Sequence, residues 1–286
     1  MANNQYRSSR DDSCDPVRHA HRRPYLTTVG AVTKSVVVKP IGAVGGFFAM
    51  SLDTFVAMFT TPFAWREFLN QVWFIARVSL VPMILMSIPF CAQINFQVNV
   101  LLVDLGAADL SGAGASLGIV NQIGPVVDVL VVAGAGATAM CADLGARTIR
   151  EELDAMRVMG INPIQALVVP RALAGTLVAT MLFGLVTLAG LASSFFFSVY
   201  VQNVTPGAWA SSLTLLIGLT DVIVAITKAM VFGLVASLIA CYKGITVGGG
   251  PQGVGNAVNE TVIYAFMALF AINVVLTGLG LQMRPH

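Results

Sequence analysis

Six charged residues crowd into eleven positions of a chain in which only 10% of the residues are charged. The cluster consists of Arg147, Arg150, Glu151, Glu152, Asp154 and Arg157. Opposite charges recur at the three- and four-residue spacings that form ion pairs along one helix: Arg147 with Glu151, Arg150 with Asp154, and Asp154 with Arg157. The sequence therefore predicts a helix over residues 147–160 whose polar face is bridged by its own side chains.

The opposite face of this predicted helix is apolar. At 100° per residue it holds Ile149, Leu153, Met156 and Gly160, with Met159 at its edge. Glu152 lies near this face, where a merely solvated helix would gain nothing from a carboxylate. Helices that rest on lipid headgroups are usually rich in Lys and Arg, whereas this one balances three arginines against three acids. The pattern favours docking on a protein partner, and Gly160 and Pro163 are expected to end the helix.

Two isolated charges, Asp128 and Lys228, lie deep inside long apolar stretches. A charge at the centre of a bilayer costs about 2.5–3.5 kcal/mol on insertion scales and is usually retained for a reason. The two residues are therefore a candidate intramembrane polar site, serving a proton path or the headgroup of a substrate. The alternative is structural, with an ion pair inside the protein or a lysine that extends to the interface.

Several other chemistries lack the residues that they need. The three histidines, His19, His21 and His286, lie at the ends of the chain, which leaves no Ser/His/Asp or Cys/His arrangement for nucleophilic catalysis. No Gly-Lys pair occurs, so a Walker A phosphate-binding loop is excluded. Cys14 has no fourth ligand at a fixed spacing beside the two nearby histidines, and we expect no metal site. The basic residues form no patch interleaved with aromatic residues, and we expect no nucleic-acid partner.

The composition indicates which elements must position these residues. Hydrophobic residues make up 56% of the 286 residues and the mean hydropathy is +0.81, which predicts an all-α integral membrane protein. We expect five membrane spans, at about 68–103, 112–146, 164–201, 221–242 and 257–283. An amphipathic helix over 41–61 is expected to lie in the membrane interface. A short outer helix should begin at Pro206, between the third and fourth spans.

Lys and Arg concentrate in residues 1–66, in residues 147–171 and at Lys243. The positive-inside rule places these segments in the cytoplasm. The N-terminus is then cytoplasmic and, with five spans, the C-terminus is extracytoplasmic. Residues 1–40 are expected to form a cytoplasmic, largely disordered basic tail with no cleaved signal peptide.

The charged segment also resembles that of a known family. Residues 142–171, ADLGARTIREELDAMRVMGINPIQALVVPR, closely fit the EExDAL-x-x-MG-x-x-P coupling segment of the MlaE/YrbE permeases, which belong to ABC-type lipid transport systems that work with MCE proteins. GAVGGFFAMS, REF, GAADLSGAG, LVVAGAGATA and GGGPQGVGNAVNETV agree with this family in order and spacing. The similarity runs from about residue 42 to the C-terminus. It is closest to the first of the two YrbE-type permeases encoded together in actinobacterial Mce systems.

This resemblance implies a non-catalytic half-permease, with residues 41–286 as its permease domain and 147–160 as its coupling helix. The residues implied to meet an ATPase are Arg147, Arg150, Glu151, Glu152, Asp154, Met156, Arg157, Met159 and Gly160. The implied partners are a second, different permease chain, cytosolic ABC ATPase subunits that use ATP and Mg, and MCE-domain proteins outside. The chain itself would bind no cofactor.

The activity implied by the resemblance is ATP-driven import of fatty acids, sterols or related lipids across the plasma membrane. The alternative from another class is a secondary transporter or channel, driven by an ion gradient, that uses Asp128 and Lys228. The absence of a visible inverted repeat argues against that alternative.

Overall fold

The computed structural model describes residues 44–59, 64–107, 110–201, 204–213, 215 and 217–282. The chain divides into two units, residues 1–46 and 47–286, and of the first only residues 44–46 are described. The predicted disordered tail over residues 1–40 therefore lies outside the described residues. Within the described ranges every regular element is a helix, in agreement with the predicted fold class.

Within the described part of the chain, five helical stretches are long and apolar enough to cross a membrane. They are Trp65–Asp104, Ser111–Ile149, Ile164–Tyr200, Leu219–Ile245 and Gly250–Gly280. Each overlaps one predicted span, so the prediction of an all-α protein with five spans is confirmed. The fifth helix begins at Gly250 rather than near residue 257. The residues before 257 are too polar to be counted in an apolar span, but they form the first turns of the same helix.

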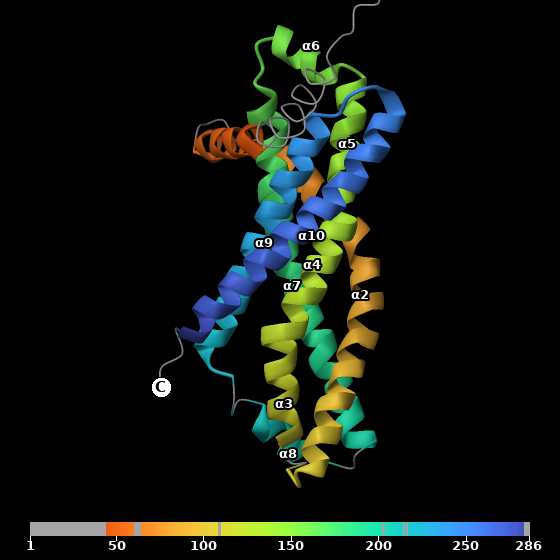
Figure 1. The fold of residues 1–286 in the computed structure, drawn as a ribbon, viewed down its shortest axis with the longest axis vertical. Helices are drawn as coiled ribbons and strands as arrows, with labels where there is room; N and C mark the ends of the chain where they lie inside the picture. The colour runs from red at the N-terminus through yellow and green to blue at the C-terminus, as the bar shows by residue number, and fades with distance from the viewer. Residues whose placement is uncertain are drawn as a thin grey trace, which may run out of the picture. The chain divides into compact units, whose positions relative to one another are not determined.

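The first, fourth and fifth spans are single helices, α2 (Trp65–Asp104), α9 (Leu219–Ile245) and α10 (Gly250–Gln282) (Figure 1). The second consists of α3 (Ser111–Gly118), the π-helix η2 (Ile119–Ile123), α4 (Gly124–Val131), the π-helix η3 (Val132–Ala137) and α5 (Thr138–Ile149). The π-helix η4 (Ile164–Val168) opens the third span and continues as α7 (Val169–Tyr200). Two short helices join the spans, α6 (Glu152–Val158) and α8 (Pro206–Ser212).

The helix α8 occupies the predicted place between the third and fourth spans. Thr205, with φ −67° and ψ 136°, precedes Pro206 at the first helical position, as the sequence predicts. Proline suits this position because the first N–H of a helix has no partner to lose. The Thr205 side chain makes no capping hydrogen bond, so proline geometry rather than a side-chain cap defines this start.

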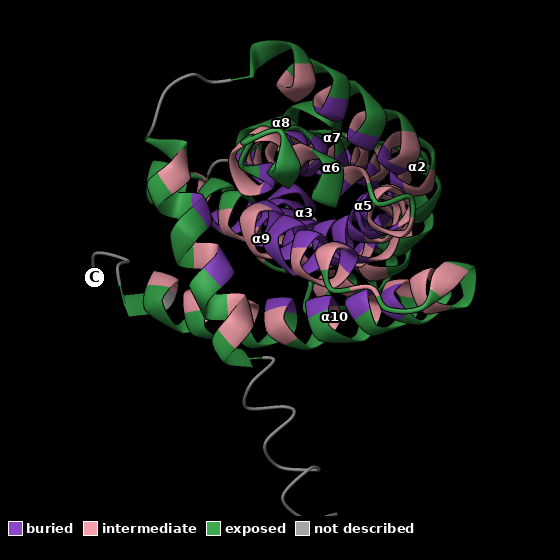
Figure 2. Cartoon of the chain, turned by 90° about the horizontal axis from the view of Figure 1, so that it is seen from above, coloured by how far each residue is buried: buried purple, intermediate pink, exposed green. Residues whose placement is uncertain are grey.

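The second span is the most buried of the five. Of its most apolar stretch 61% is buried, against 28% for α2 and 11% for α10. Its small residues Ala133, Ala137 and Cys141 are fully buried, because small side chains let neighbouring helices approach closely. Figure 2 shows the buried residues gathered along α3, α5 and α9, while α10 is largely exposed. The exposed apolar surface of α2 and α10 is what a bilayer or another membrane subunit would cover.

A shorter apolar helix, Val44–Met58, precedes the spans, within the predicted range 41–61. Its residues 47–58 run across the direction of the long helices (Figure 1, orange). Phe48, Leu52 and Phe55 are 60%, 65% and 47% exposed, whereas Met50 and Thr54 are buried. One face is therefore held by the bundle and the other is free for lipid. Its location in the membrane interface stays a prediction.

Candidate coupling segment and its buried ionic network

The segment 147–160 forms two helices instead of the predicted single one. The helix α5 runs on to Ile149, and α6 begins at Glu152. Between them Glu151 adopts a left-handed conformation with φ 59°, and its N–H donates to the Thr148 carbonyl at 3.1 Å. The predicted coupling helix over 147–160 is therefore wrong in its continuity. A helical wheel cannot reveal this, because a single left-handed residue changes the direction of the chain without changing the spacing of the sequence.

The break also changes the ion pairs. Arg147 pairs with Asp143 (Nε to Oδ2, 3.4 Å) instead of Glu151. Arg150 pairs with Glu152 (Nη1 to Oε1, 3.4 Å) instead of Asp154. Of the three predicted pairs only that of Arg157 with Asp154 forms, at 2.9 Å, and it is the only one whose two residues both lie in α6. Glu152, expected beside the methionines, is the first residue of α6 and pairs with Arg150 in the turn that precedes this helix.

The apolar face predicted for this segment is present on α6. Leu153 is 3% exposed and lies in a cluster with Met50, Leu144, Leu167, Val168 and Cys241, against which Met156 also packs. The side chains in this cluster come from the N-terminal helix, α5, η4 and α9. Burial of Leu153 therefore fixes α6 to the end of the bundle formed by the second, third and fourth spans.

The far end of α6 is an apolar tip, defined by Val158, Met159 and Ile161, which are 89%, 66% and 45% exposed. Gly160 ends the helix as predicted, with φ 77°. The N–H of Ile161 donates to the Met156 carbonyl at 2.9 Å, and that of Gly160 to the Arg157 carbonyl at 3.0 Å. These two bonds are the Schellman arrangement that glycine favours after a helix. Met159 is among the predicted coupling residues, whereas Val158 and Ile161 are not, although three apolar residues around a helix-ending glycine were a signal.

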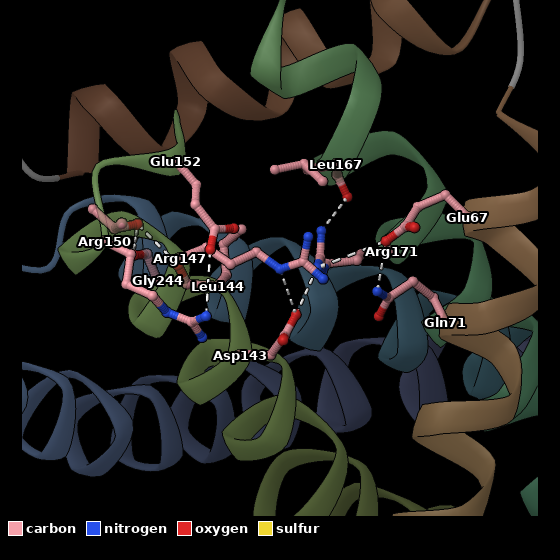
Figure 3. A network of polar contacts seen from close by, with 11 residues as sticks. Glu67, Gln71, Asp143, Leu144, Arg147, Arg150, Glu152, Leu167, Arg171 and Gly244 are labelled. Atoms are coloured by element: carbon pink, nitrogen blue, oxygen red, sulfur yellow. Dashed lines mark hydrogen bonds and ion pairs between the residues drawn. The ribbon is translucent and has the colours of Figure 1, made fainter. Parts of the chain in front are cut away.

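A buried arginine lies beneath the segment (Figure 3). The side chain of Arg171, on α7, is fully buried and donates from Nη2 to Asp143 Oδ2 at 2.6 Å and from Nη1 to the Leu167 carbonyl at 3.1 Å. The Glu67 carboxylate of α2 lies 3.9 Å from the same Nη2 atom and accepts a hydrogen bond from Gln71 at 2.8 Å. One guanidinium thus joins α2, α5 and α7 (Figure 3).

The segment is also tied to the fourth span. The Thr148 hydroxyl lies 3.0 Å from the Gly244 carbonyl of α9 and 2.9 Å from the Leu144 carbonyl. The end of α5, from which the chain continues into α6, is therefore linked to α9 by a hydrogen bond and to α7 and α2 through Arg171. Arg171, Asp143 and Glu67 were not among the predicted site residues, because they come from three segments far apart in the sequence. The only available signal was that each lies where an apolar span meets charged residues.

The two predicted intramembrane charges lie in different surroundings. Asp128, on α4 between two π-helices, is fully buried, and neither of its carboxylate oxygens has a hydrogen-bond partner among the described residues. Lys228, on α9, is 3% exposed and donates to the Thr277 hydroxyl at 2.9 Å. No ion pair joins these two described residues, so the structure does not bring them together as one site. The described ranges also hold no group of three His, Cys, Asp or Glu side chains placed to bind a metal ion.

Residues 68–279 match the family model described as Permease MlaE, which covers most of the chain. The chain belongs to the MlaE permease family. The resemblance is therefore confirmed at the level of the family, and its assignment to the first permease of actinobacterial Mce systems stays a prediction.

Similar proteins carry related names. A probable ABC transporter permease of Synechocystis is 32% identical over 177 residues, which cover 62% of this chain and 67% of that protein. The chloroplastic protein TRIGALACTOSYLDIACYLGLYCEROL 1 of Arabidopsis thaliana is 31% identical over 178 residues, covering 62% of this chain and 51% of its own length. A probable ABC transporter permease of Rickettsia conorii is 27% identical over 243 residues, 85% of this chain and 93% of that protein. The match thus spans about half of the Arabidopsis protein and most of the Rickettsia protein.

Proposed function

We propose that this MlaE-family chain is the transmembrane permease subunit of an ATP-driven Mce lipid import complex. It would move hydrophobic lipids such as fatty acids or sterols across the plasma membrane. In this proposal ATP and Mg are used by a cytosolic ABC ATPase and the chain itself is not catalytic. A second YrbE-type permease would complete the pathway, and MCE-domain proteins would stand on the outer side. The family match and the names of the similar proteins support the ABC permease part of this proposal.

The observation that carries the proposal is the apolar tip of α6. Soluble surfaces do not usually place Val158 and Met159 side by side at such high exposure unless another protein covers them. The tip lies at the end of α6, and Leu153 packs this helix against the second, third and fourth spans. A partner that closes on the tip would therefore pull on the helices that enclose the pathway. Residues 147–160 keep their predicted role as the ATPase-coupling segment, now with Val158 and Ile161 added.

The proposed orientation follows from charge. The basic segment 147–171 would lie in the cytoplasm, with the N-terminus, and the C-terminus would lie outside. The helix α8, which follows the far end of α7, would then be extracytoplasmic. This orientation puts the apolar tip on the side where ATP is available.

The experiment tests docking separately from insertion. Val158→Asp adds a charge to the apolar tip, and Asp154→Arg reverses a charge on α6. Both variants should insert in the membrane at native amounts but retain less than about a tenth of the ATPase on purification, because a buried interface tolerates an unpaired charge poorly. Ser211→Asp, an exposed change on α8 at the opposite end of α7, is the matched control and should retain all of it. Native ATPase retention and native lipid uptake in both α6 variants would show that this segment does not couple the two proteins.

One observation favours the ion-driven alternative, namely the carboxylate of Asp128, which is buried and lacks a described partner. A buried ionisable group without a partner is the usual sign of an ion or proton path in a membrane protein. The same uptake assay separates the two functions. Uptake that continues after the ATPase is depleted, but stops when the proton or sodium gradient is collapsed, would support the alternative.

A further inference from the structure

A small cavity lies between the second span, α9 and α10, away from the coupling segment. Its volume is about 110 Å³ and it is lined by Leu117, Asn121, Gln122, Asp221, Val224, Lys228, Thr277 and Gly280. A water molecule occupies about 30 Å³ of liquid, so this volume holds a carboxylate or phosphate group but not a whole lipid. Leu117, Val224 and Gly280 add an apolar wall. The cavity therefore offers a polar end and an apolar side.

The positive charge of the cavity comes from Lys228, and Asp221 adds a carboxylate to the lining. The Lys228 side chain is almost fully buried and forms no ion pair with any described carboxylate. The second lysine of α9 is a useful comparison, because Lys243 pairs with Glu260 at 2.6 Å and lies 4.4 Å from the centre of the Tyr264 ring. Both lysines belong to one helix, yet of the two only Lys243 has a described carboxylate partner. A buried ammonium group without an opposite charge is costly, and membrane proteins retain such groups mainly at substrate or ion pathways.

The neighbours of Lys228 leave donors available. The Thr277 hydroxyl donates to the Asn273 carbonyl at 2.6 Å, so it accepts from Lys228 and uses one of the three ammonium protons. The side-chain nitrogen of Asn121 is buried and has no partner among the described residues. Asp221 also lines the cavity, but its carboxylate accepts the Gly218 N–H at 3.2 Å at the start of α9, two turns before Lys228. The cavity thus combines a positive charge with an unused amide donor.

We propose that this cavity binds the anionic headgroup of the transported lipid, with Lys228 as its counter-charge and Asn121 as a second donor. The ligand class is an acidic lipid, which carries either the carboxylate of a free fatty acid or a lipid phosphate. Charge-assisted hydrogen bonds from two donors suit both groups. A neutral sterol would gain nothing from Lys228. The inference rests on the proposed function, since it names the substrate class of that lipid pathway.

The position of the cavity along α9 indicates on which side of the membrane the headgroup site would lie. Lys228 lies nine residues after the start of α9, or about 13 Å along the helix, and the opposite end of α9 contacts the coupling segment. The cavity is therefore in the half of the bundle remote from α6. In the proposed orientation this half is extracytoplasmic, where an imported lipid arrives.

Binding of four lipids to the purified full-length chain in nanodiscs tests the site. Oleate and oleyl alcohol share one chain and differ in charge, and phosphatidic acid and diacylglycerol form the same kind of pair with phosphate. Lys228→Met should weaken binding of oleate, of phosphatidic acid or of both by about 10-fold or more, because it removes a charged hydrogen bond. Oleyl alcohol and diacylglycerol should bind the variant as they bind the native chain. Lys228→Arg should restore binding, and Lys243→Met, on the same helix, is the matched control.

The possible results distinguish a failure of the proposed headgroup site from a failure of the proposed lipid transport. A loss confined to oleate identifies a carboxylate, and a loss confined to phosphatidic acid identifies a phosphate. Equal binding of the charged and neutral lipid within both pairs by the native chain would overturn the site without any variant. Unchanged binding of both acidic lipids by Lys228→Met would overturn it as well. If Lys228→Met does not insert, Asn121→Leu takes its place, with the same expected direction. A native chain that binds none of the four lipids would instead contradict the proposed lipid transport.

Discussion

At the scale of single residues, Arg171 shows how a membrane protein uses a fully buried charge. Its Nη2 atom lies 2.6 Å from one carboxylate and 3.9 Å from a second, and its Nη1 atom donates to a carbonyl at 3.1 Å, while its Nε atom has no partner among the described residues. A buried charge is stable only when its partners replace the water that it has lost. Because those partners come from three spans, Arg171 also fixes the relative positions of the helices beneath α6.

Arg171→Met should therefore destabilise the protein. The expected loss is about 1.5–3 kcal/mol, since the change removes hydrogen bonds between charged groups and leaves Asp143 with only its pairing to Arg147. The midpoint of unfolding by SDS in mixed micelles measures this change. Arg157→Met is the matched control, because the pair of Arg157 with Asp154 is exposed and should contribute only about 0–1 kcal/mol. Equal midpoints for the two variants would contradict a structural role of the buried network.

The same residues mark the limit of prediction at this scale. Spacing correctly predicted the pair of Arg157 with Asp154, because both residues belong to one helix. It was wrong for Arg147 and Arg150, since their partners depend on the left-handed conformation of Glu151. Contacts within an element follow from sequence, whereas contacts across a break depend on backbone angles that composition does not report.

At the scale of elements, α7 and α9 cross at two glycines. A Cβ atom at Gly233 would lie 2.7 Å from the Gly175 carbonyl oxygen and 2.8 Å from the Thr176 Cα atom. A side chain there would meet backbone, which cannot rotate away. The close approach brings α9 against α7, and so it supports the positions of both Lys228 and the Gly244 carbonyl that Thr148 contacts.

Gly233→Ala should separate these helices and cost about 1–3 kcal/mol, as overpacking in a dense core does. Gly184→Ala, on α7, the helix that Gly233 packs against, is the control, because no heavy atom lies within 4 Å of the added Cβ atom. It should change stability by less than about 1 kcal/mol, since alanine also favours a helix more than glycine does. Thermal unfolding in detergent measures both variants. A Gly233→Ala protein as stable as Gly184→Ala would show that the crossing tolerates a wider spacing.

At the scale of the whole molecule, orientation determines which surface can meet the ATPase. The chain without Cys14 (Cys14→Ser) offers a suitable background, because Cys91, Cys141 and Cys241 are buried free thiols. In intact cells, Ser211→Cys on α8 should react with a membrane-impermeant thiol reagent. Asp154→Cys on α6 should react only after the cells are permeabilised. The background without either new cysteine should stay unlabelled, and the reverse pattern would contradict the proposed orientation and the role of α6 in docking.

The order of residues along the chain is enough to identify an all-α membrane protein of the MlaE permease family with five spans. Long apolar runs and local motifs encode these properties, and both are readable along the chain. The sequence also located the charged segment between the second and third spans and the glycine that ends α6.

The three-dimensional arrangement was needed to show that this segment is two helices, that Arg171 joins three spans beneath it, and that Lys228 lies in a cavity without a described carboxylate partner. These features depend on which residues from distant segments meet. Such meetings are set by helix crossings at positions such as Gly233 and by one left-handed residue, and no periodicity along the chain records them.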